Sequence, residues 1–404
     1  MGRSGQVAIL GAGPIGLEAA LAAADAGRPF TVYEAAPHAG GHVRRWGHVP
    51  LFTSWARNVS PRMRRHLEAA GAGVPGGPEC PTGHQLARSL LDPLAALPEV
   101  APHLRLGARV EAVGRQDLLK HEEIATPARA ERPFRLLVRD RSGREDLASA
   151  DVVLDCTGTY GRPNAVGDGG IPALGERALG EEIHRALPDL DADGRRWAGR
   201  TTLLVGAGHS AQTAALGLAG LAGRAPGTRV VWAVRSAAPT WGAVPHDPLP
   251  ERAALVERAG ALAGGEEPAV ELRTGVVVER LARHDGRVAV TLRGDGGTEE
   301  VVVDRVLALT GFVGDHDLYR QLQVHECYAT AAPIQLAAAL LGEGAGDCLD
   351  QTSQGVDTLR NPEPNFFILG VKSYGRNNLF LMSVGWGQVE EVFAALSGDP
   401  GPAG

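Results

Sequence analysis

Apolar and polar positions fall into clear blocks at the start of the chain. Residues 7–10 form a continuous apolar run, which is typical of a strand buried on both faces of a parallel sheet. Residues 17–26 are rich in alanine and predict a helix that is closed by Gly27. Residues 30–33 predict a second strand, which ends at the acidic residue Glu34. The pattern therefore predicts a strand, a helix and a strand in succession.

A glycine-rich loop joins the first predicted strand to the helix, with the sequence Gly-Ala-Gly-Pro-Ile-Gly at residues 11–16. Gly11 suits a tight turn, Gly13 lets the backbone approach a pyrophosphate, and Gly16 lets the helix pack closely on the strand. The helix N-terminus offers free N–H groups to phosphates, and the carboxylate of Glu34 suits the hydroxyls of an adenosine ribose. This stretch therefore predicts a dinucleotide site.

The same unit occurs a second time. Strands are predicted at residues 201–205 and 230–234 and a helix at 212–221, with the loop Gly-Ala-Gly-His-Ser-Ala at 206–211. Its second strand ends at Arg235 and has no acid there. An arginine accommodates the 2′-phosphate of NADPH, whereas a carboxylate suits a free 2′-hydroxyl. The second unit therefore predicts NADPH, with NADH left open because Arg235 is a single residue.

Weaker patterns fill the remaining chain. Helices are predicted at residues 61–71 and 82–97, and strands at 104–113, 134–139, 270–274, 276–281, 288–292 and 301–303. Residues 115–132 are charged and are interpreted as an excursion on the surface. Residues 162–200 are rich in Pro, Gly and Asp and are interpreted as a connection.

Two further apolar runs end in the same dipeptide. They lie at residues 151–155 and 306–309 and lead into Thr157-Gly158 and Thr310-Gly311. Duplicated glycine loops with duplicated Thr-Gly returns resemble the two-dinucleotide-binding flavoproteins. That superfamily includes flavin-containing monooxygenases, thioredoxin-reductase-like enzymes and bacterial N-hydroxylases.

The resemblance implies an α/β fold with two Rossmann-like dinucleotide-binding domains, the NADPH lobe being inserted into a discontinuous FAD lobe. The implied domains are 1–175 (FAD, first part), 176–315 (NAD(P)H) and 316–404 (FAD, second part). The implied cofactor contacts are Gly11, Gly13, Pro14, Ile15, Gly16, Glu34, Ala35, Gly41, His42, Trp46, Ser54, Val110, Thr157, Gly158, Gly206, Gly208, His209, Ser210, Ala211, Arg235, Thr310, Gly311, Gly370, Gly387 and Gln388.

The tail is expected to return to the FAD lobe. Residues 365–370 predict a strand that ends at Gly370, where the superfamily usually continues with an Asp that contacts the ribityl chain; Val371 stands there instead. Residues 385–388 are expected to begin a helix whose first amides face the flavin N1–C2=O edge. Between them, the polar segment 372–378 supplies the candidate catalytic residues Lys372, Tyr374 and Arg376, with a solvated loop as the alternative.

Two bound dinucleotides imply hydride transfer from nicotinamide to flavin N5. Dithiol reductases then need a cysteine pair, and the four cysteines include no CxxC; only Cys327 and Cys348 are left as a pair to be considered. Dioxygen is the expected acceptor, through a flavin C4a-(hydro)peroxide. The expected function is an NADPH-dependent FAD monooxygenase acting on a small-molecule N or S centre. The alternatives are an NAD(P)H-dependent flavin reductase or electron-transfer enzyme, and a non-enzymatic FAD-binding sensor, against which the second nucleotide lobe argues.

Composition adds limits to this picture. A length of 404 residues predicts two domains. The net charge of −7 gives no reason to expect nucleic acid or an anionic membrane as a partner. No apolar run has the length of a membrane span, and the first strand begins too early to leave room for a signal peptide. The 13 histidines show no metal-ligand spacing. We therefore expect a cytoplasmic enzyme whose partners are a small-molecule substrate and dioxygen, with a homodimer left open.

Overall fold

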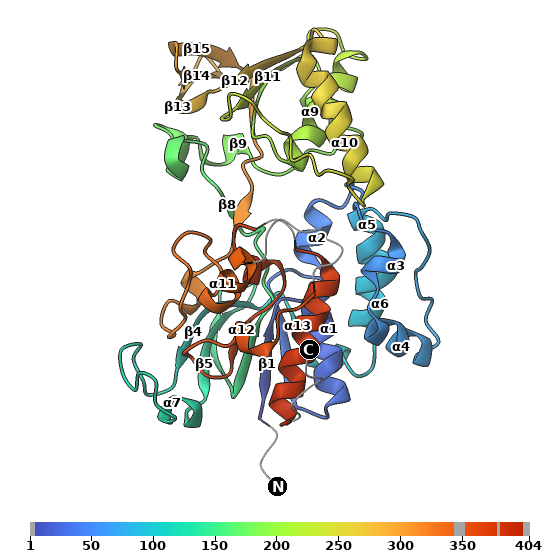
Figure 1. The fold of residues 1–404 in the computed structure, drawn as a ribbon, viewed down its shortest axis with the longest axis vertical. Coiled ribbons are helices and arrows are strands. Elements are labelled where there is room, and N and C mark those ends of the chain that lie inside the picture. Colours follow the sequence, from blue (N-terminus) through green and yellow to red (C-terminus); the bar gives the residue numbers. More distant parts are fainter. Residues whose placement is uncertain (1–4, 343–351, 378–379, 399–404) are drawn as a thin grey trace. The chain divides into compact units, whose positions relative to one another are not determined.

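The computed structural model describes residues 5–342, 352–377 and 380–398 (Figure 1). Within these residues the chain forms two compact units. The first contains the residues up to Arg162 and from Val313 onward, and the second contains Pro163–Phe312. The first unit is therefore discontinuous in sequence, and the second is a single insertion into it.

A five-stranded parallel sheet forms the centre of the first unit. Its strand order is β18 (Phe366–Ile368), β7 (Val152–Asp155), β1 (Val7–Leu10), β2 (Phe30–Glu34) and β3 (Leu104–Leu106). All four residues of β1 are buried, as the apolar run predicted. The carboxyl ends of β1, β2, β7 and β18 meet at one edge of this sheet.

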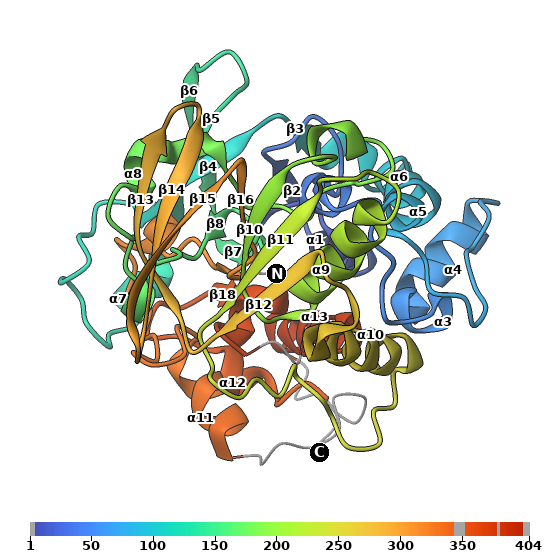
Figure 2. The same cartoon turned by 90° about the horizontal axis from the view of Figure 1, so that it is seen from above.

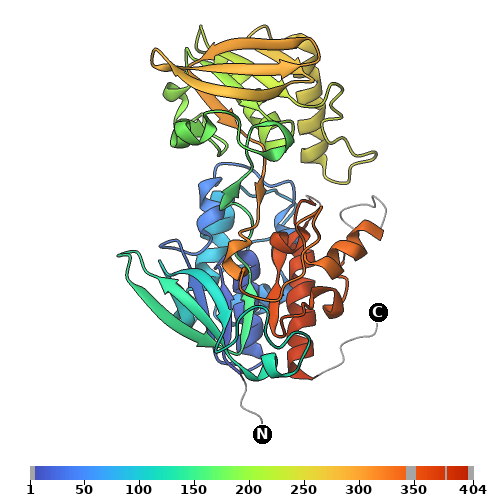
Figure 3. The same cartoon turned by 90° about the vertical axis from the view of Figure 1, so that its left-hand side faces the viewer.

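Different layers cover the two faces of this sheet, which explains why β1 is apolar at every position. Helices α1 (Pro14–Asp25) and α13 (Met382–Ser397) pack together, and Ile9 belongs to the core on their side. The antiparallel strands β4 (Arg109–Arg115), β5 (Phe134–Arg139) and β6 (Glu145–Ala150) lie beside the sheet (teal in Figure 3). Leu10 packs into the core on that second side.

Short helices connect β2 to β3. They are α2 (Gly41–Arg45), α3 (Trp55–Asn58), α4 (Pro61–Ala69), α5 (Gly83–Leu86), η1 (Ala87–Leu91), α6 (Asp92–Ala95) and η2 (Ala101–His103). The helix predicted at 82–97 is present as α5, η1 and α6 in succession, with π-type bonding in the middle piece. Thr82 begins it with a capping box, because its hydroxyl accepts from Gln85 N and the Gln85 side chain accepts from Thr82 N.

The second unit repeats the arrangement. Its parallel sheet has the order β12 (Val270–Thr274), β11 (Arg229–Val234), β10 (Thr201–Val205), β16 (Arg305–Ala308) and β9 (Ile183–His184). Helices α9 (His209–Ala222) and α10 (Pro250–Ala261) cover one face of this sheet. The antiparallel strands β13 (Val277–His284), β14 (Arg287–Gly294) and β15 (Gly297–Val303) cover the other (Figure 2).

The predicted connection at residues 162–200 belongs to the second unit for nearly all of its length. Gly167 and Leu174 form β-bridges with Val278 and Arg280, and β9 adds an edge strand to the parallel sheet. The structural division therefore falls at 162/163 and 312/313, where the sequence placed it at 175/176 and 315/316.

The remaining elements are short or lie in the tail. They are α7 (Ala128–Glu131), β8 (Arg162–Pro163), η3 (Asp168–Gly170), α8 (Glu176–Leu179), η4 (Gly180–Glu182), η5 (Gly194–Arg196), η6 (Leu262–Glu266), β17 (Phe312–Val313), η7 (Asp317–Tyr319), α11 (Ile334–Gly342), α12 (Val356–Leu359) and η8 (Gly370–Tyr374).

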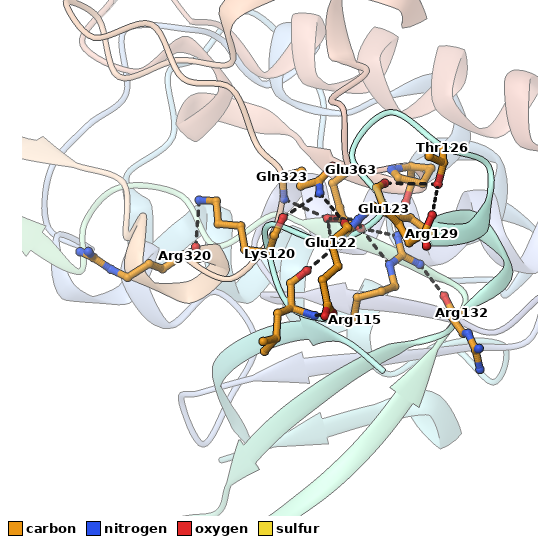
Figure 4. Close-up of polar contacts among 12 residues, drawn as sticks. Arg115, Lys120, Glu122, Glu123, Thr126, Arg129, Arg132, Arg320, Gln323 and Glu363 are labelled. Atoms are coloured by element: carbon orange, nitrogen blue, oxygen red, sulfur yellow. Dashed lines mark hydrogen bonds and ion pairs between the residues drawn. The ribbon is translucent and has the colours of Figure 1, made fainter. Parts of the chain in front are cut away.

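The charged segment 115–132 is only in part the surface excursion that its composition predicted. Most of it is exposed, but the side chains of Arg115 and Arg129 are fully buried against Glu363 (Figure 4). Arg115 Nη2 lies 2.8 Å from one oxygen of Glu363, and Arg129 Nη2 lies 2.7 Å from the other. The surface interpretation is wrong for these two arginines because a distant carboxylate neutralises them.

Backbone carbonyl groups take the remaining arginine donors in this cluster. Arg115 donates to the carbonyls of Arg132 and Pro364, and Arg129 donates to those of Leu119 and Glu122. The Glu363 carboxylate also accepts from the backbone N–H of Gln323. The cluster therefore ties the excursion to the segment that enters β18, and two positive charges share one carboxylate.

We expect Glu363→Gln to lower the free energy of unfolding by about 3–5 kcal/mol, because two buried guanidinium groups lose their only anionic partner in the cluster. The measurement is chemical denaturation followed by circular dichroism.

Glu131→Gln is the matched control, since Glu131 is exposed in the same excursion and its change is expected to stay within about 0.5 kcal/mol. Equal stabilities for the two variants would contradict the assigned role of the cluster.

Candidate dinucleotide-binding sites

The first glycine loop has the backbone geometry that its sequence predicted. Gly11 has a φ of 96°, in the left-handed region, and a side-chain carbon there would lie 2.8 Å from the carbonyl oxygen of Cys156. A side-chain carbon at Gly16 would overlap the carbonyl oxygen of Gly11. Gly13 differs, because its φ is −79° and no atom lies within 4 Å of the place of a side-chain carbon. The loop is therefore tight at Gly11 and Gly16 and open at Gly13.

Glu34, the predicted ribose ligand, is held beside this loop. One of its carboxylate oxygens accepts from the backbone N–H of Ala12 at 2.8 Å, and the other accepts from that of Ala36 at 2.8 Å. Gly41 begins α2 next to it, and a side-chain carbon there would lie 3.3 Å from the carboxylate. The acid at the end of β2 is thus fixed in position at the loop.

Aromatic side chains gather after this acid. The rings of His42 and Trp46 lie 6.1 Å and 6.2 Å from the ring of Tyr160, measured between centroids. Burial lowers the pKa of His42, and Arg45 and Arg109 lower it further, which favours the neutral imidazole. The buried Nε1 of Trp46 has no hydrogen-bond partner among the described residues. This donor is therefore available to a ligand.

The remaining predicted contacts of this unit are spread over the same elements. Pro14 and Ile15 are the first two residues of α1, and Ala35 is exposed directly after β2. Ser54 is the N-cap residue of α3, and Val110 adjoins a register shift in β4.

The Thr157-Gly158 return is held by a buried ion pair that the sequence did not reveal. Asp155, at the end of β7, accepts from the hydroxyl of Thr157 at 2.6 Å. Its other oxygen accepts from Lys372 Nζ at 2.6 Å, and both side chains have no exposed surface. Lys372 also donates to the carbonyl of Asp315 at 2.8 Å and to Thr157 Oγ1 at 3.2 Å. Gly158 follows with a φ of 69°.

The three candidate catalytic residues lie in different surroundings. Lys372 directs its ammonium group to three oxygen atoms inside the protein, as described above. Tyr374 is buried and its ring packs edge-on against Phe380, whereas Arg376 is exposed. The polar segment is therefore buried in its first part and exposed at Arg376; its last residue, Asn378, lies outside the described residues.

The helix expected to begin at residues 385–388 begins at Met382. Gly387 and Gln388 therefore lie in its second turn, and the free amide groups of the helix N-terminus belong to the residues before them. Gln388 has another role, since its Oε1 accepts from Gly370 N at 2.8 Å and its Nε2 donates to Ser373 Oγ at 2.9 Å. The expectation that the amides of 385–388 begin the helix is wrong, because residues 382–384 already form its first turn.

The second glycine loop repeats the first. Gly206 has a φ of 131°, and a side-chain carbon there would overlap the carbonyl oxygen of Leu309. Gly208 has a φ of −72° and no atom within 4 Å of the place of a side-chain carbon. Ala211 replaces the third glycine and is fully buried, while Ser210 is exposed. Burial lowers the pKa of His209, the first residue of α9, and Arg252 lowers it further.

A cleft of about 330 Å³ lies at this loop. It is lined by Ala207, Gly208, Ser236, Ala238, Pro239, Thr240, Trp241 and Gly242. Arg235, the predicted 2′-phosphate ligand, is exposed and immediately precedes Ser236 at the carboxyl end of β11. The structure thus brings the glycine loop and the end of β11 to the same cleft.

Thr310 and Gly311 hold the start of the second unit. Thr310 Oγ1 donates to the carbonyl of Asn164 at 2.9 Å, and the Asn164 side chain donates to the carbonyl of Thr310 at 3.0 Å. Gly311 has a φ of 86° and accepts from the backbone N–H of Asn164. No feature of the sequence pointed to Asn164, because the segment around it has no periodic pattern.

The described cysteines are single thiols. Cys80, Cys156 and Cys327 form no disulfide, and Cys348 lies outside the described residues. Burial raises the pKa of Cys156, which lies under the first glycine loop.

Residues 5–342, 352–377 and 380–398 contain no group of three His, Cys, Asp or Glu side chains suited to a metal ion. Within the same ranges no helix has the length and hydropathy of a membrane span.

Comparisons with known proteins agree with this geometry. Residues 9–60 match the family described as NAD(P)-binding Rossmann-like domain. No curated protein matches the sequence. The structure is similar to that of the bacillithiol disulfide reductase Bdr from Bacillus cereus, with a TM-score of 0.69, 20% identity and coverage of 98% of this chain and 99% of that chain.

Two further solved structures extend the comparison. The thioredoxin reductase of T. acidophilum has a TM-score of 0.60 at 15% identity, covering 97% of this chain and 99% of that chain. The ornithine N-hydroxylase of Kutzneria sp. 744, with reduced FAD, NADP⁺ and L-ornithine, has a TM-score of 0.61 at 14% identity, covering 98% and 99%.

The fold predicted from the duplicated loops and returns is confirmed. The chain has the α/β fold of the two-dinucleotide-binding-domain flavoproteins, built from two Rossmann-like units.

Proposed function

We propose that this protein is an FAD-dependent oxidoreductase that uses NADPH, and that it is a monooxygenase acting on a nitrogen or sulfur centre of a small molecule. The observation that carries the proposal is the pair of glycine loops. Each is tight at its first glycine, Gly11 or Gly206, and open at its second, Gly13 or Gly208, where a pyrophosphate needs room. One loop is accompanied by Glu34 and the other by Arg235.

Several observations in the first unit fit FAD. The space at Gly13 suits the pyrophosphate, and the fixed carboxylate of Glu34 suits the ribose hydroxyls. The unpaired Nε1 of Trp46 offers a buried donor. Bound FAD would supply two-electron redox chemistry at this site. A neighbour in fold, the Kutzneria enzyme, carries reduced FAD together with NADP⁺.

Within this proposal, the Lys372–Asp155 ion pair is a positioning device. It fixes Thr157 through two hydrogen bonds, so that the return after β7 keeps one conformation beside the first glycine loop. Gln388 holds Gly370 in the same way, two residues after the neighbouring strand β18. Because Val371 has no polar side chain, a polar contact to the ribityl chain at this point would come from the backbone.

The cysteine pattern favours dioxygen over a disulfide as the final electron acceptor. Dithiol reductases work with a cysteine pair, and this sequence has no CxxC. Cys156 is the described cysteine that lies under the first glycine loop, and burial raises its pKa and keeps it a thiol. The proposed net reaction consumes substrate, dioxygen, NADPH and a proton, and yields oxidised substrate, NADP⁺ and water.

A second candidate function is an NAD(P)H-dependent flavin reductase or electron-transfer enzyme that inserts no oxygen. The likeness to the bacillithiol disulfide reductase, which spans nearly the whole of both chains, favours it. The two candidates differ in whether oxygen atoms reach the product.

Alanine substitutions at the two open glycines distinguish the two sites. Gly13→Ala and Gly208→Ala are both expected to fold, because each new methyl group enters open space at an ordinary φ. Gly13→Ala is expected to lose FAD, whereas Gly208→Ala is expected to keep FAD and lose NADPH affinity. The measurements are flavin absorbance after gel filtration and titration with NADP⁺.

Gly16→Ala is the contrasting variant, since its methyl group would overlap the Gly11 carbonyl oxygen and should lower the folded yield itself. Full FAD content in Gly13→Ala would show that the first site is misassigned.

Arg235→Ala is expected to raise the dissociation constant for NADPH about tenfold or more and to leave that for NADH nearly unchanged. The lost charge-assisted contact to a phosphate is worth about 1.5–3 kcal/mol. Arg229→Ala is the control, because Arg229 is exposed at the opposite end of the same strand. Equal losses for both nucleotides in Arg235→Ala would refute the role in 2′-phosphate recognition.

The fate of oxygen tests the reaction class. The protein is assayed with a panel of primary amines and thioethers. With at least one compound, we expect the amount of peroxide released to be smaller than the amount of NADPH oxidised. The same compound is expected to gain one oxygen atom from isotopically labelled dioxygen. Oxygen electrode, peroxide assay and mass spectrometry supply the three measurements.

A variant with Cys80, Cys327 and Cys348 changed to Ser and Cys156 changed to Ala should retain these activities. If it still loses its visible absorbance on anaerobic addition of NADPH but no longer turns over, a thiol lies on the electron path. The disulfide-reducing alternative would then replace the monooxygenase.

A further inference from the structure

Gln212 connects the two walls of the cleft in the second unit. It lies in the first turn of α9 and is fully buried. Its Nε2 donates to the carbonyl of Ala207 at 2.9 Å, in the glycine loop, and to the carbonyl of Trp241 at 2.8 Å, in the loop after β11. One amide group therefore spans from the phosphate-binding loop to the opposite wall.

The contact at Trp241 holds an unfavourable backbone conformation. Trp241 has a φ of 57°, in the left-handed region that residues with a side chain rarely occupy. Its ring packs on Trp232 at 4.7 Å between centroids, and Trp232 Nε1 donates to the carbonyl of Gly206 at 2.8 Å. Trp241 is thus held by the Gln212 hydrogen bond and by packing on Trp232, and both of these side chains donate to the glycine loop.

The far end of the same loop is anchored separately. Arg252, on α10, makes two hydrogen bonds to the carboxylate of Asp247, at 2.7 and 2.8 Å. Asp247 also accepts from the backbone N–H of Leu249. The residues from Ser236 to Gly242 that line the cleft therefore lie between β11 and an anchored end, and Gln212 is their tie to the glycine loop.

We propose that Gln212 is a positioning residue that fixes the width of the pyridine-nucleotide cleft, by holding the Trp241 wall at a set distance from the glycine loop. The inference rests on the proposed NADPH-dependent function and adds a residue that would touch no nucleotide itself. Since the wall borders Gly208, which serves the pyrophosphate common to both nucleotides, its displacement should weaken NADPH and NADH alike.

Gln212→Met tests this in the FAD-loaded full chain, because methionine keeps the length of the side chain and removes both donors. We expect the dissociation constants for NADPH and NADH to rise by a similar factor, about tenfold or more. The rate of flavin reduction at saturating NADPH should stay within about twofold. Amide hydrogen exchange without nucleotide should quicken at residues 237–242.

Thr213→Val is the matched control, since the Thr213 hydroxyl donates to the carbonyl of His209 within the same helix and not to the loop. It is expected to change neither affinity nor exchange. Unchanged exchange at 237–242 in Gln212→Met would overturn the proposal. A loss confined to NADPH would do so too, because that pattern belongs to a 2′-phosphate contact such as Arg235.

If the unaltered protein binds neither nucleotide, the proposed function fails. The exchange measurement still stands in that case, and it decides by itself whether Gln212 holds the Trp241 wall.

Discussion

Both units depend on backbone approaching backbone more closely than any side chain allows. In the first unit the constraint lies between Gly16 and the carbonyl of Gly11, and in the second between Gly206 and the carbonyl of Leu309. In the first unit this close approach brings α1 directly onto the end of β1, and in the second it brings the loop after β10 against the residue that follows β16. As a result, the helix N-terminus, which is the positive end of the helix dipole, lies beside the carboxyl ends of the parallel strands.

The features that could be predicted from the sequence are those that depend on residues close together in the chain. Strand β1, the two glycine loops and Glu34 lie within short windows, so their roles depend on neighbours in sequence and on a regular period. The same holds for the duplicated returns at Thr157 and Thr310, whose pattern predicted the confirmed fold.

The errors arise where the partner is distant in sequence. Arg115 and Arg129 looked like surface charge because their carboxylate, Glu363, is 248 and 234 residues away. The ion pair of Lys372 was likewise not foreseen, because its partner Asp155 is 217 residues away; its place among the candidate catalytic residues stays a prediction. The start of α13 was misjudged for a local reason, since the glycines at 385 and 387 are weak helix formers and tertiary packing overrides that preference.

The shared carboxylate of Glu363 also bears on how the chain is made. A ribosome releases β1, β2 and β7 and both buried arginines long before it reaches Glu363 and β18. The inserted unit, by contrast, is continuous and is complete at Phe312. Vectorial synthesis therefore finishes the inserted unit first, while the earlier half of the outer unit waits with two uncompensated cations and an open strand edge at β7. A chain that ends before Glu363 would therefore lack both the carboxylate for the two arginines and the strand that pairs with the edge of β7.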